Sequence, residues 1–197
     1  MQQIKINMNK IIIALILLMN FVAFAQKPCE IDVDVKDSIG TYKATKQYMV
    51  FERSFAGNAT NVFFALTNTN GVLGVETQII QRSSEFVKAF CFDNNSKIYF
   101  QLQNGKIVTL LHIGKDDCGT LIRDDKNVNN RILTGSFVFA VENFEDLKTS
   151  PVTFMRIKYG SETMDYPLRS GFVSELDKKM YQADTYFISF VKCIEAN

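Results

Sequence analysis

The residues with the clearest chemical potential are a single histidine and four cysteines. His112 is the only histidine in the 197-residue chain, and it follows the apolar pair Leu110-Leu111. A Cys–His or Ser–His nucleophile pair would have to use its imidazole as the base. The chain has no G-x-S-x-G motif, and its cysteines are better explained as disulfide partners. We therefore interpret His112 as a strand-end histidine and predict no catalytic residue.

Oxygen-bearing side chains gather in one polar segment, residues 114–131. Such segments can hold calcium, which takes about six to eight oxygen ligands. The segment has no EF-hand or Gly-Asp repeat spacing, and basic residues dilute its negative charge, so we expect no metal and no cofactor. Long loops on a β scaffold often carry recognition, and we predict that this one is the candidate recognition loop. Its candidate residues are Asp116, Asp117, Asp124, Asp125, Asn127 and Arg131.

Two further carboxylates, Asp32 and Asp34, point to the same face of an alternating segment, residues 30–36. General acid–base catalysis needs one carboxylate with a raised pKa in a desolvated pocket. Neighbouring exposed acids on an edge strand do not meet that need, and such charges discourage edge-to-edge aggregation. We expect no catalysis from this pair.

The cysteines indicate a covalent framework. No two of them form a C-x-x-C pair, and their spacings of 62, 27 and 75 residues do not suggest a zinc site. An even number of cysteines in a chain sent to an oxidising compartment predicts two disulfides. Three connectivities remain open, and the candidates are Cys29, Cys91, Cys118 and Cys193.

The N-terminal residues have the pattern of a cleaved export signal. Lys5 and Lys10 precede an apolar run that ends in Ala23-Phe24-Ala25, an A-x-A cleavage site. The run is shorter than the roughly 20 residues that span a bilayer. We predict a signal peptide over residues 1–25, a single β-rich domain over residues 26–197, and a periplasmic or secreted location with no membrane span after cleavage.

Charge and aromatic content limit the partners. Residues 26–197 hold 20 basic and 21 acidic residues, a formal charge of −1. The sequence shows no basic stripe that would neutralise phosphates, so we expect no nucleic acid as a partner. The 17 Phe and 7 Tyr residues, with no Trp, mostly alternate within apolar segments, which indicates a core.

Three reversals predict the scaffold. Asn104-Gly105 and Asn70-Gly71 suit two-residue type I′ turns, and Gly160-Ser161 suits type II′. The first sets Gln103 opposite Lys106, and the third sets Arg156 opposite Asp165. The three predicted inner faces are Ile98, Phe100, Leu102, Ile107, Thr109 and Leu111; Val62, Phe64, Leu66, Leu73, Val75 and Ile79; and Met155, Ile157, Tyr159, Met164, Tyr166 and Leu168.

The remaining elements complete the fold class. Residues 30–36, 48–55 and 136–141 read as strands, and 142–147 as a short helical turn. Asp184 is a candidate N-cap for a helix whose apolar stripe is Tyr186, Phe187, Phe190, Val191 and Ile194. We predict a mainly β fold: a single antiparallel β-sandwich or partly closed barrel with a C-terminal amphipathic helix packed on it.

Two segments carry a family resemblance. The Ala-Phe-Ala-Gln signal end resembles those of exported proteins from Gram-negative bacteria, and residues 151–195 resemble the C-terminal portion of small uncharacterised exported bacterial proteins. The resemblance implies no known activity. We expect a non-catalytic envelope or secreted binding protein for an envelope macromolecule or a small ligand. The alternative is an envelope-polymer hydrolase or inhibitor-type factor that uses carboxylates, which would need convergent Asp or Glu in a deep cleft.

Overall fold

Strands make up most of the part of the chain that the computed structural model describes, residues 28–195. The predicted signal peptide and its cleavage site lie outside the described residues. The strands are β1 (Ile31–Lys36), β2 (Thr41–Thr45), β3 (Tyr48–Phe55), β4 (Asn58–Thr69), β5 (Val72–Ser83), β6 (Lys97–Leu102), β7 (Ile107–His112), β8 (Thr120–Arg123), β9 (Asn129–Phe139), β10 (Val152–Lys158), β11 (Thr163–Pro167), β12 (Phe172–Val173) and β13 (Met180–Tyr181).

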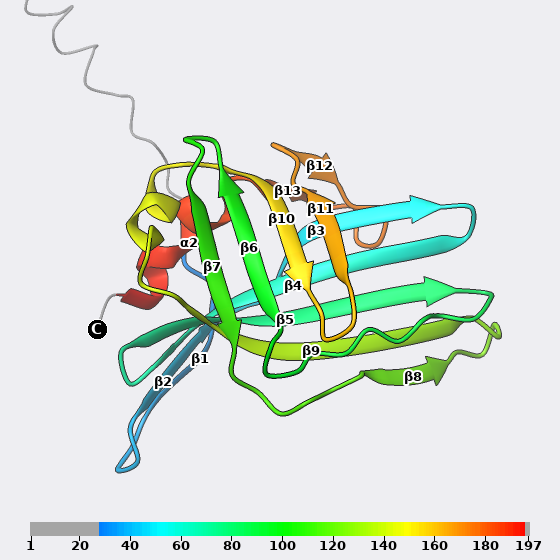
Figure 1. Cartoon of the computed structure of the whole chain (residues 1–197), viewed down its shortest axis with the longest axis horizontal. Helices are drawn as coiled ribbons and strands as arrows, with labels where there is room; N and C mark the ends of the chain where they lie inside the picture. The colour runs from blue at the N-terminus through cyan, green and yellow to red at the C-terminus, as the bar shows by residue number, and fades with distance from the viewer. Residues whose placement is uncertain (1–27, 196–197) are drawn as a thin grey trace, which may run out of the picture.

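The first eleven strands form one antiparallel sheet that folds over itself (Figure 1). Its order is β1-β2-β4-β5-β9-β7-β6-β10-β11, with β3 also beside β4 and β8 also beside β9. β9 pairs with β5 through residues 129–138 but with β7 only through residues 137–139. The sheet therefore bends at the end of β9, and β6, β7, β10 and β11 cross in front of the longer strands. The predicted mainly β class is confirmed, and the sheet does not close into a barrel.

The core lies between the two layers and beneath one helix. Phe64 on β4 meets Phe100 on β6 edge to face, with ring centroids 5.9 Å apart. Phe187 of the helix α2 (Tyr186–Glu195) lies 4.9 Å from Phe100 and so joins both layers at one end. Full burial of such a side chain contributes about 1.5–3 kcal/mol. The predicted packing of the helix on the sheet is therefore confirmed.

The predicted ends of the helical segments are only partly correct. α2 begins at Tyr186, and Oδ1 of Asp184 is buried without a hydrogen-bond partner, so it does not cap the helix. Of the predicted stripe, Phe190 is only half-buried and the other members are buried. The short turn predicted at 142–147 is a 3-10 helix, η1 (Phe144–Lys148).

The hairpin predicted at Asn70-Gly71 is confirmed. Both residues have positive φ, 52° and 86°, as a type I′ turn requires. Thr69 consequently pairs with Val72, and the register continues to Val62 opposite Ile79. The predicted inner face is buried except for Leu73, which packs on the rim of the core.

The register predicted at Asn104-Gly105 is wrong by one residue. Only Gly105 has positive φ, and the N–H of Leu102 donates to the carbonyl of Lys106, so residues 103–105 form a three-residue reversal. Phe100 therefore pairs with Val108, and a shift of one residue turns the whole of β7 over. Val108, Leu110 and His112 are buried, whereas the predicted inward residues Ile107 and Leu111 are exposed.

Contacts with the η1 segment explain the longer reversal. The backbone N–H of Gln103 donates to the carbonyl of Pro151 at 2.8 Å. The side-chain amide of Asn104 donates to Asp146 at 2.9 Å, and its backbone N–H donates to Ser150 at 3.2 Å. These partners lie more than 40 residues away in sequence, so the dipeptide alone does not reveal them.

The third hairpin keeps its predicted register but not its predicted turn type. Arg156 pairs with Asp165 through a bidentate contact of 2.6 and 2.9 Å. Gly160 lacks the positive φ that a type II′ turn needs. Its N–H donates to the carbonyl of Cys91, and an added Cβ would lie 2.8 Å from a carboxylate oxygen of Asp93. A larger residue at position 160 would therefore have to displace the Asp93 carboxylate.

The two predicted disulfides are present. Cys29 bonds to Cys193 and ties the N-terminal segment to α2. Cys91 bonds to Cys118 and joins the segment after β5 to the one before β8. The structure thus selects one of the three connectivities, and no cysteine is free among the described residues.

Candidate functional site

The predicted recognition loop, residues 114–131, is largely a folded hairpin. β8 and the start of β9 lie within it. Asp124 closes the hairpin turn, because its Oδ1 accepts the N–H groups of Val128 and Lys126 at 2.9 Å each. The hydrogen bond from Val128, followed by that from Lys126, holds the pKa of the Asp124 carboxyl below its usual range.

Other predicted loop residues also support the backbone. Asp117 pairs with Phe92 in an isolated bridge, and its carboxylate accepts the N–H of Gly119. The guanidinium of Arg131 donates to the carbonyls of Val87 and Cys118. Asn127 takes a positive φ in the turn, and Asp116 and Asp125 are exposed. The structure does not bring the six together around one cavity, and a recognition role for this segment stays a prediction.

His112 packs as a core residue at the end of β7. Its ring lies 5.6 Å from that of Phe92 and 5.1 Å from that of Phe137. Its Nδ1 is buried without a hydrogen-bond partner, and all four cysteines are in disulfides. The described residues therefore provide no nucleophile pair that uses this histidine.

Carboxylates do not converge on the described surface. Asp32 and Asp34 are exposed on β1, an edge of the sheet. Five surface hollows are lined by at most one carboxylate each. Over residues 28–195 no group of three or more His, Cys, Asp or Glu side chains could hold a metal ion. The enzyme alternative thus gains no support from this part of the chain.

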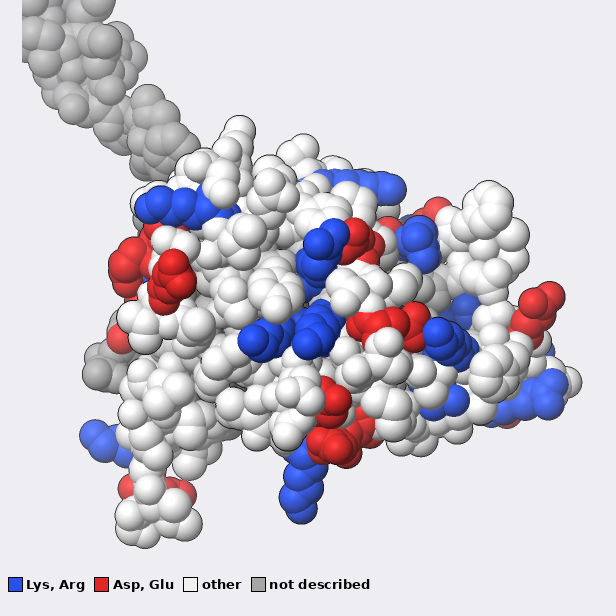
Figure 2. Space-filling model, viewed as in Figure 1, with Lys and Arg blue, Asp and Glu red and all other residues white. Residues whose placement is uncertain are grey.

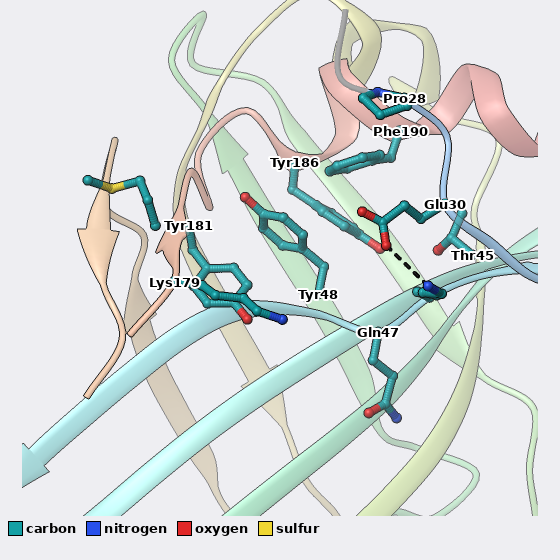
Figure 3. A pocket seen from close by; sticks show the side chains of 11 residues that line it. Pro28, Glu30, Thr45, Gln47, Tyr48, Lys179, Tyr181, Tyr186 and Phe190 are labelled. Atoms are coloured by element: carbon teal, nitrogen blue, oxygen red, sulfur yellow. Dashed lines mark ion pairs between the residues drawn. The ribbon is translucent and has the colours of Figure 1, made fainter. Parts of the chain in front are cut away.

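An aromatic pocket lies where the N-terminal segment, the β2–β3 turn, β13 and α2 meet (Figure 3). Its volume is about 280 Å³. Neighbouring elements position the walls: α2 packs against β2 and β4, and β13 lies in contact with β3. The lining residues are Pro28, Glu30, Thr45, Lys46, Gln47, Tyr48, Lys179, Met180, Tyr181, Tyr186 and Phe190.

Tyr48 and the three rings that contact it make the apolar wall. Figure 3 shows Tyr48 at the centre of this group. Its ring centroid lies 4.9 Å from Tyr181, 5.2 Å from Tyr186 and 5.3 Å from Phe190. Tyr186 and Phe190 are one helical turn apart on α2, so the same helix face presents both rings. The pocket therefore has a continuous aromatic surface built from β3, β13 and α2.

Hydrogen bonds fix three of these rings, including that of Tyr186, whose hydroxyl donates to the carbonyl of Phe64 at 3.3 Å. The hydroxyl of Tyr48 accepts the N–H of Gln182 at 2.7 Å. The hydroxyl of Tyr181 donates to Asp177 at 2.6 Å, which holds the pKa of Asp177 below its usual value. Burial is the main cause that raises the pKa of Tyr181 and Tyr186. Tyr181 and Tyr186 are therefore neutral at physiological pH.

The charged groups of the pocket have internal partners. Nζ of Lys46 lies 3.4 Å from a carboxylate oxygen of Glu30, and Figure 3 shows Glu30 across the pocket from Tyr181. Nζ of Lys179 lies 3.9 Å from Asp177. The side chain of Gln47 points away from the rings in Figure 3. The pocket consequently offers aromatic faces and paired charges, with no unbalanced ion.

A disulfide holds one wall of the pocket in place. Pro28 and Glu30 line the pocket and flank Cys29, which is bonded to Cys193 of α2. The N-terminal wall and the helical wall are therefore covalently joined.

The sequence did not reveal this site. Its residues come from four separate segments, and only Tyr186 and Phe190 stood out, as core positions of the helix. No described helix is long and apolar enough to cross a membrane. No protein-family model, curated protein or solved structure matches the chain, so its function has to be argued from its own residues.

Proposed function

We propose that the chain is an exported, non-catalytic binding protein whose aromatic pocket holds a small ligand. The observation that carries this proposal is the contact of Tyr48 with three other rings beside a hollow of about 280 Å³. Ligand sites are typically concave and aromatic, with a few well-placed polar groups. The two disulfides support delivery to an oxidising compartment, periplasmic or extracellular.

The pocket favours a neutral ring bearing hydroxyl groups. Its volume is close to the lower end of ligand pockets, about 300 Å³, so the ligand is the size of one or two rings. The Glu30–Lys46 pair can donate and accept hydrogen bonds at the polar end. A charged ligand would find no unpaired group of opposite charge in the pocket, yet it would still lose its hydration on binding. We therefore expect a charged ligand to bind more weakly than a neutral one.

Three probes that share one ring test this preference. Tyrosol is neutral, 4-hydroxyphenylacetate is an anion and tyramine is a cation. We expect tyrosol to perturb the amide NMR signals of residues 45–48 and 179–190 at the lowest concentration. Equal or tighter binding of either charged probe, or signal changes elsewhere, would contradict the proposal.

A matched pair of variants locates the ligand. Phe190→Leu removes a pocket ring and should weaken tyrosol binding roughly three- to tenfold, since an aromatic contact contributes about 0.5–1.5 kcal/mol. Phe144→Leu removes a half-buried ring from η1, outside the pocket lining, and should leave binding unchanged. Equal losses in both variants would indicate a general loss of stability.

Export has a separate test. Mass spectrometry of the exported protein should give a chain that begins at Gln26 and is four hydrogens lighter than its reduced form. A chain that retains Met1 and four reactive thiols would contradict export and both disulfides.

A further inference from the structure

The outward side of the second layer is a bare sheet face. β7, β6, β10 and β11 lie side by side, and no other described element lies in front of them (Figure 1). Their register places outward side chains in three rows across the strands. The rows are Leu111–Lys97–Lys158–Thr163, Thr109–Tyr99–Arg156–Asp165 and Ile107–Gln101–Phe154–Pro167.

This face carries excess positive charge. Lys97 and Lys158 are direct cross-strand neighbours, and neither forms an ion pair with any described residue. The only acid in the three rows, Asp165, is bonded to Arg156. Figure 2 shows basic side chains near the middle of this side of the molecule, with acidic side chains beside them. Like charges directly opposite each other destabilise a sheet, so the lysine pair costs stability and has no partner within the described fold.

Aromatic and amide groups accompany the charges. Tyr99 and Phe154 are half-buried, with parts of their rings open to solvent. The guanidinium of Arg156 lies 5.7 Å from the centre of the Phe154 ring. A shallow hollow of about 460 Å³ includes both rings, Gln101 and Lys158. The face thus combines stacking surface, hydrogen-bonding groups and unneutralised cations.

We propose that this face binds an anionic polysaccharide, a function separate from the aromatic pocket. A sugar ring would lie against Tyr99, and its hydroxyl groups would bond to Gln101 and Thr109. The carboxylates of the same chain would neutralise Lys97 and Lys158. The charge of an acidic polymer is complementary to that of the face, and its binding would relieve the repulsion between the two lysines.

The same chemistry argues against other acidic polymers. An acidic peptide that adds to a sheet does so at an edge strand, whereas these groups lie on a face. Nucleic acid carries a dense line of phosphates and is usually bound by more basic groups than the three present. The sugar ring is the occupant that uses the tyrosine and the amide as well as the lysines.

Binding of polygalacturonate tests the proposal, with dextran, polyglutamate and oligothymidylate as the comparison polymers. Calorimetry of the full exported chain should show binding of polygalacturonate that weakens as salt rises, and little binding of the others. Lys158→Glu should weaken polygalacturonate binding at least about tenfold, since a charge-assisted hydrogen bond contributes enough for such a change. The same variant should keep or raise the melting temperature, because it removes the repulsion with Lys97.

Controls separate this face from general charge and from the pocket. Lys36→Glu makes the same charge change on an exposed position of β1 and should leave binding unchanged. Tyr99→Val should weaken polygalacturonate binding severalfold, and the pocket variant Phe190→Leu should not affect it. Equal binding of polyglutamate or oligothymidylate, equal losses in Lys36→Glu and Lys158→Glu, or no binding of polygalacturonate would overturn the proposal.

Discussion

Alkaline pH should unfold this protein through three buried tyrosines. Tyr159, Tyr166 and Tyr186 are at most 4% exposed, and burial is the first cause that raises the pKa of each. The hydroxyls of Tyr159 and Tyr166 also share a hydrogen bond of 2.7 Å. Because an unfolded tyrosine ionises near about pH 10 and the folded pKa is higher, stability is fully present below pH 10 and falls as the pH rises above it.

The size of the effect follows from the unfolded pKa. Each tyrosine that stays protonated in the folded state lowers the free energy of unfolding by about 1.4 kcal/mol at pH 11 and about 2.7 kcal/mol at pH 12. Tyr159 and Tyr186, whose pKa values are raised most among the three, together remove roughly 3 and 5 kcal/mol, against a typical total of about 5–15 kcal/mol, and Tyr166 adds to this loss. We therefore expect cooperative unfolding between about pH 11 and pH 12.

Tyrosinate absorbance gives a direct assay, because the chain has no Trp to obscure it. Tyr159 and Tyr186 should ionise only together with loss of the near-ultraviolet circular dichroism. The Tyr159→Phe/Tyr166→Phe variant removes both members of the hydrogen-bonded pair, so it leaves no unpaired hydroxyl and should lose at least half of the pH dependence. Ionisation of all seven near pH 10 in a protein with native dichroism would refute the reasoning.

Three other perturbations test the core, the surface charges and the pocket. Phe64→Ala should cost about 3–5 kcal/mol in urea unfolding, since it empties the contact between the two layers; a loss below 1 kcal/mol would place this ring outside the core. Arg156 holds the pKa of Asp165 below its usual value, so stability from this pair is present above the unfolded pKa, about 3.9, and is lost as the pH falls through the lower folded pKa. The urea midpoint of Asp165→Asn should therefore lie below that of the wild type at pH 5 and converge with it at pH 2.5, and an unchanged gap would contradict this. Replacing Cys29 and Cys193 together by Ser opens a loop of 164 residues and should cost roughly 3–5 kcal/mol as well as weaken tyrosol binding; unchanged binding would show that the disulfide does not hold the pocket wall.

Two identical dipeptides show how far local sequence predicts this fold. Asn70-Gly71 and Asn104-Gly105 both permit a tight reversal, because glycine and asparagine tolerate positive φ. The first forms the two-residue turn, and its register follows correctly. At the second, Gln103 and Asn104 bond to the distant η1 segment, and the longer reversal exchanges the two faces of β7. The strands of these two hairpins were therefore predictable, whereas the register of the second hairpin depended on tertiary contacts.

The candidate sites were less predictable than the fold, for a related reason. A polar run in the sequence reveals which side chains are present but not what they bond to. Asp124 and Arg131 looked available for recognition, yet both bond to backbone groups of their own hairpin. The pocket has no local pattern, since Glu30, Tyr48 and Phe190 meet only after the chain has crossed the sheet and returned. The pairing of Lys97 with Lys158 could not be predicted either, because the two residues are far apart in sequence and only the register between β6 and β10 places them opposite each other.

The two proposed binding surfaces depend on different parts of the fold. The pocket is built from the N-terminal segment, the β2–β3 turn, β13 and α2, and its walls depend on α2 and on the bond from Cys29 to Cys193. The outer face depends on strand register alone, so Lys97 and Lys158 remain opposite each other as long as β6 and β10 stay paired. Breaking the bond between Cys29 and Cys193 should therefore alter the pocket without altering the outer face of β7, β6, β10 and β11. A single sheet can in this way carry two binding surfaces whose loss can be measured separately.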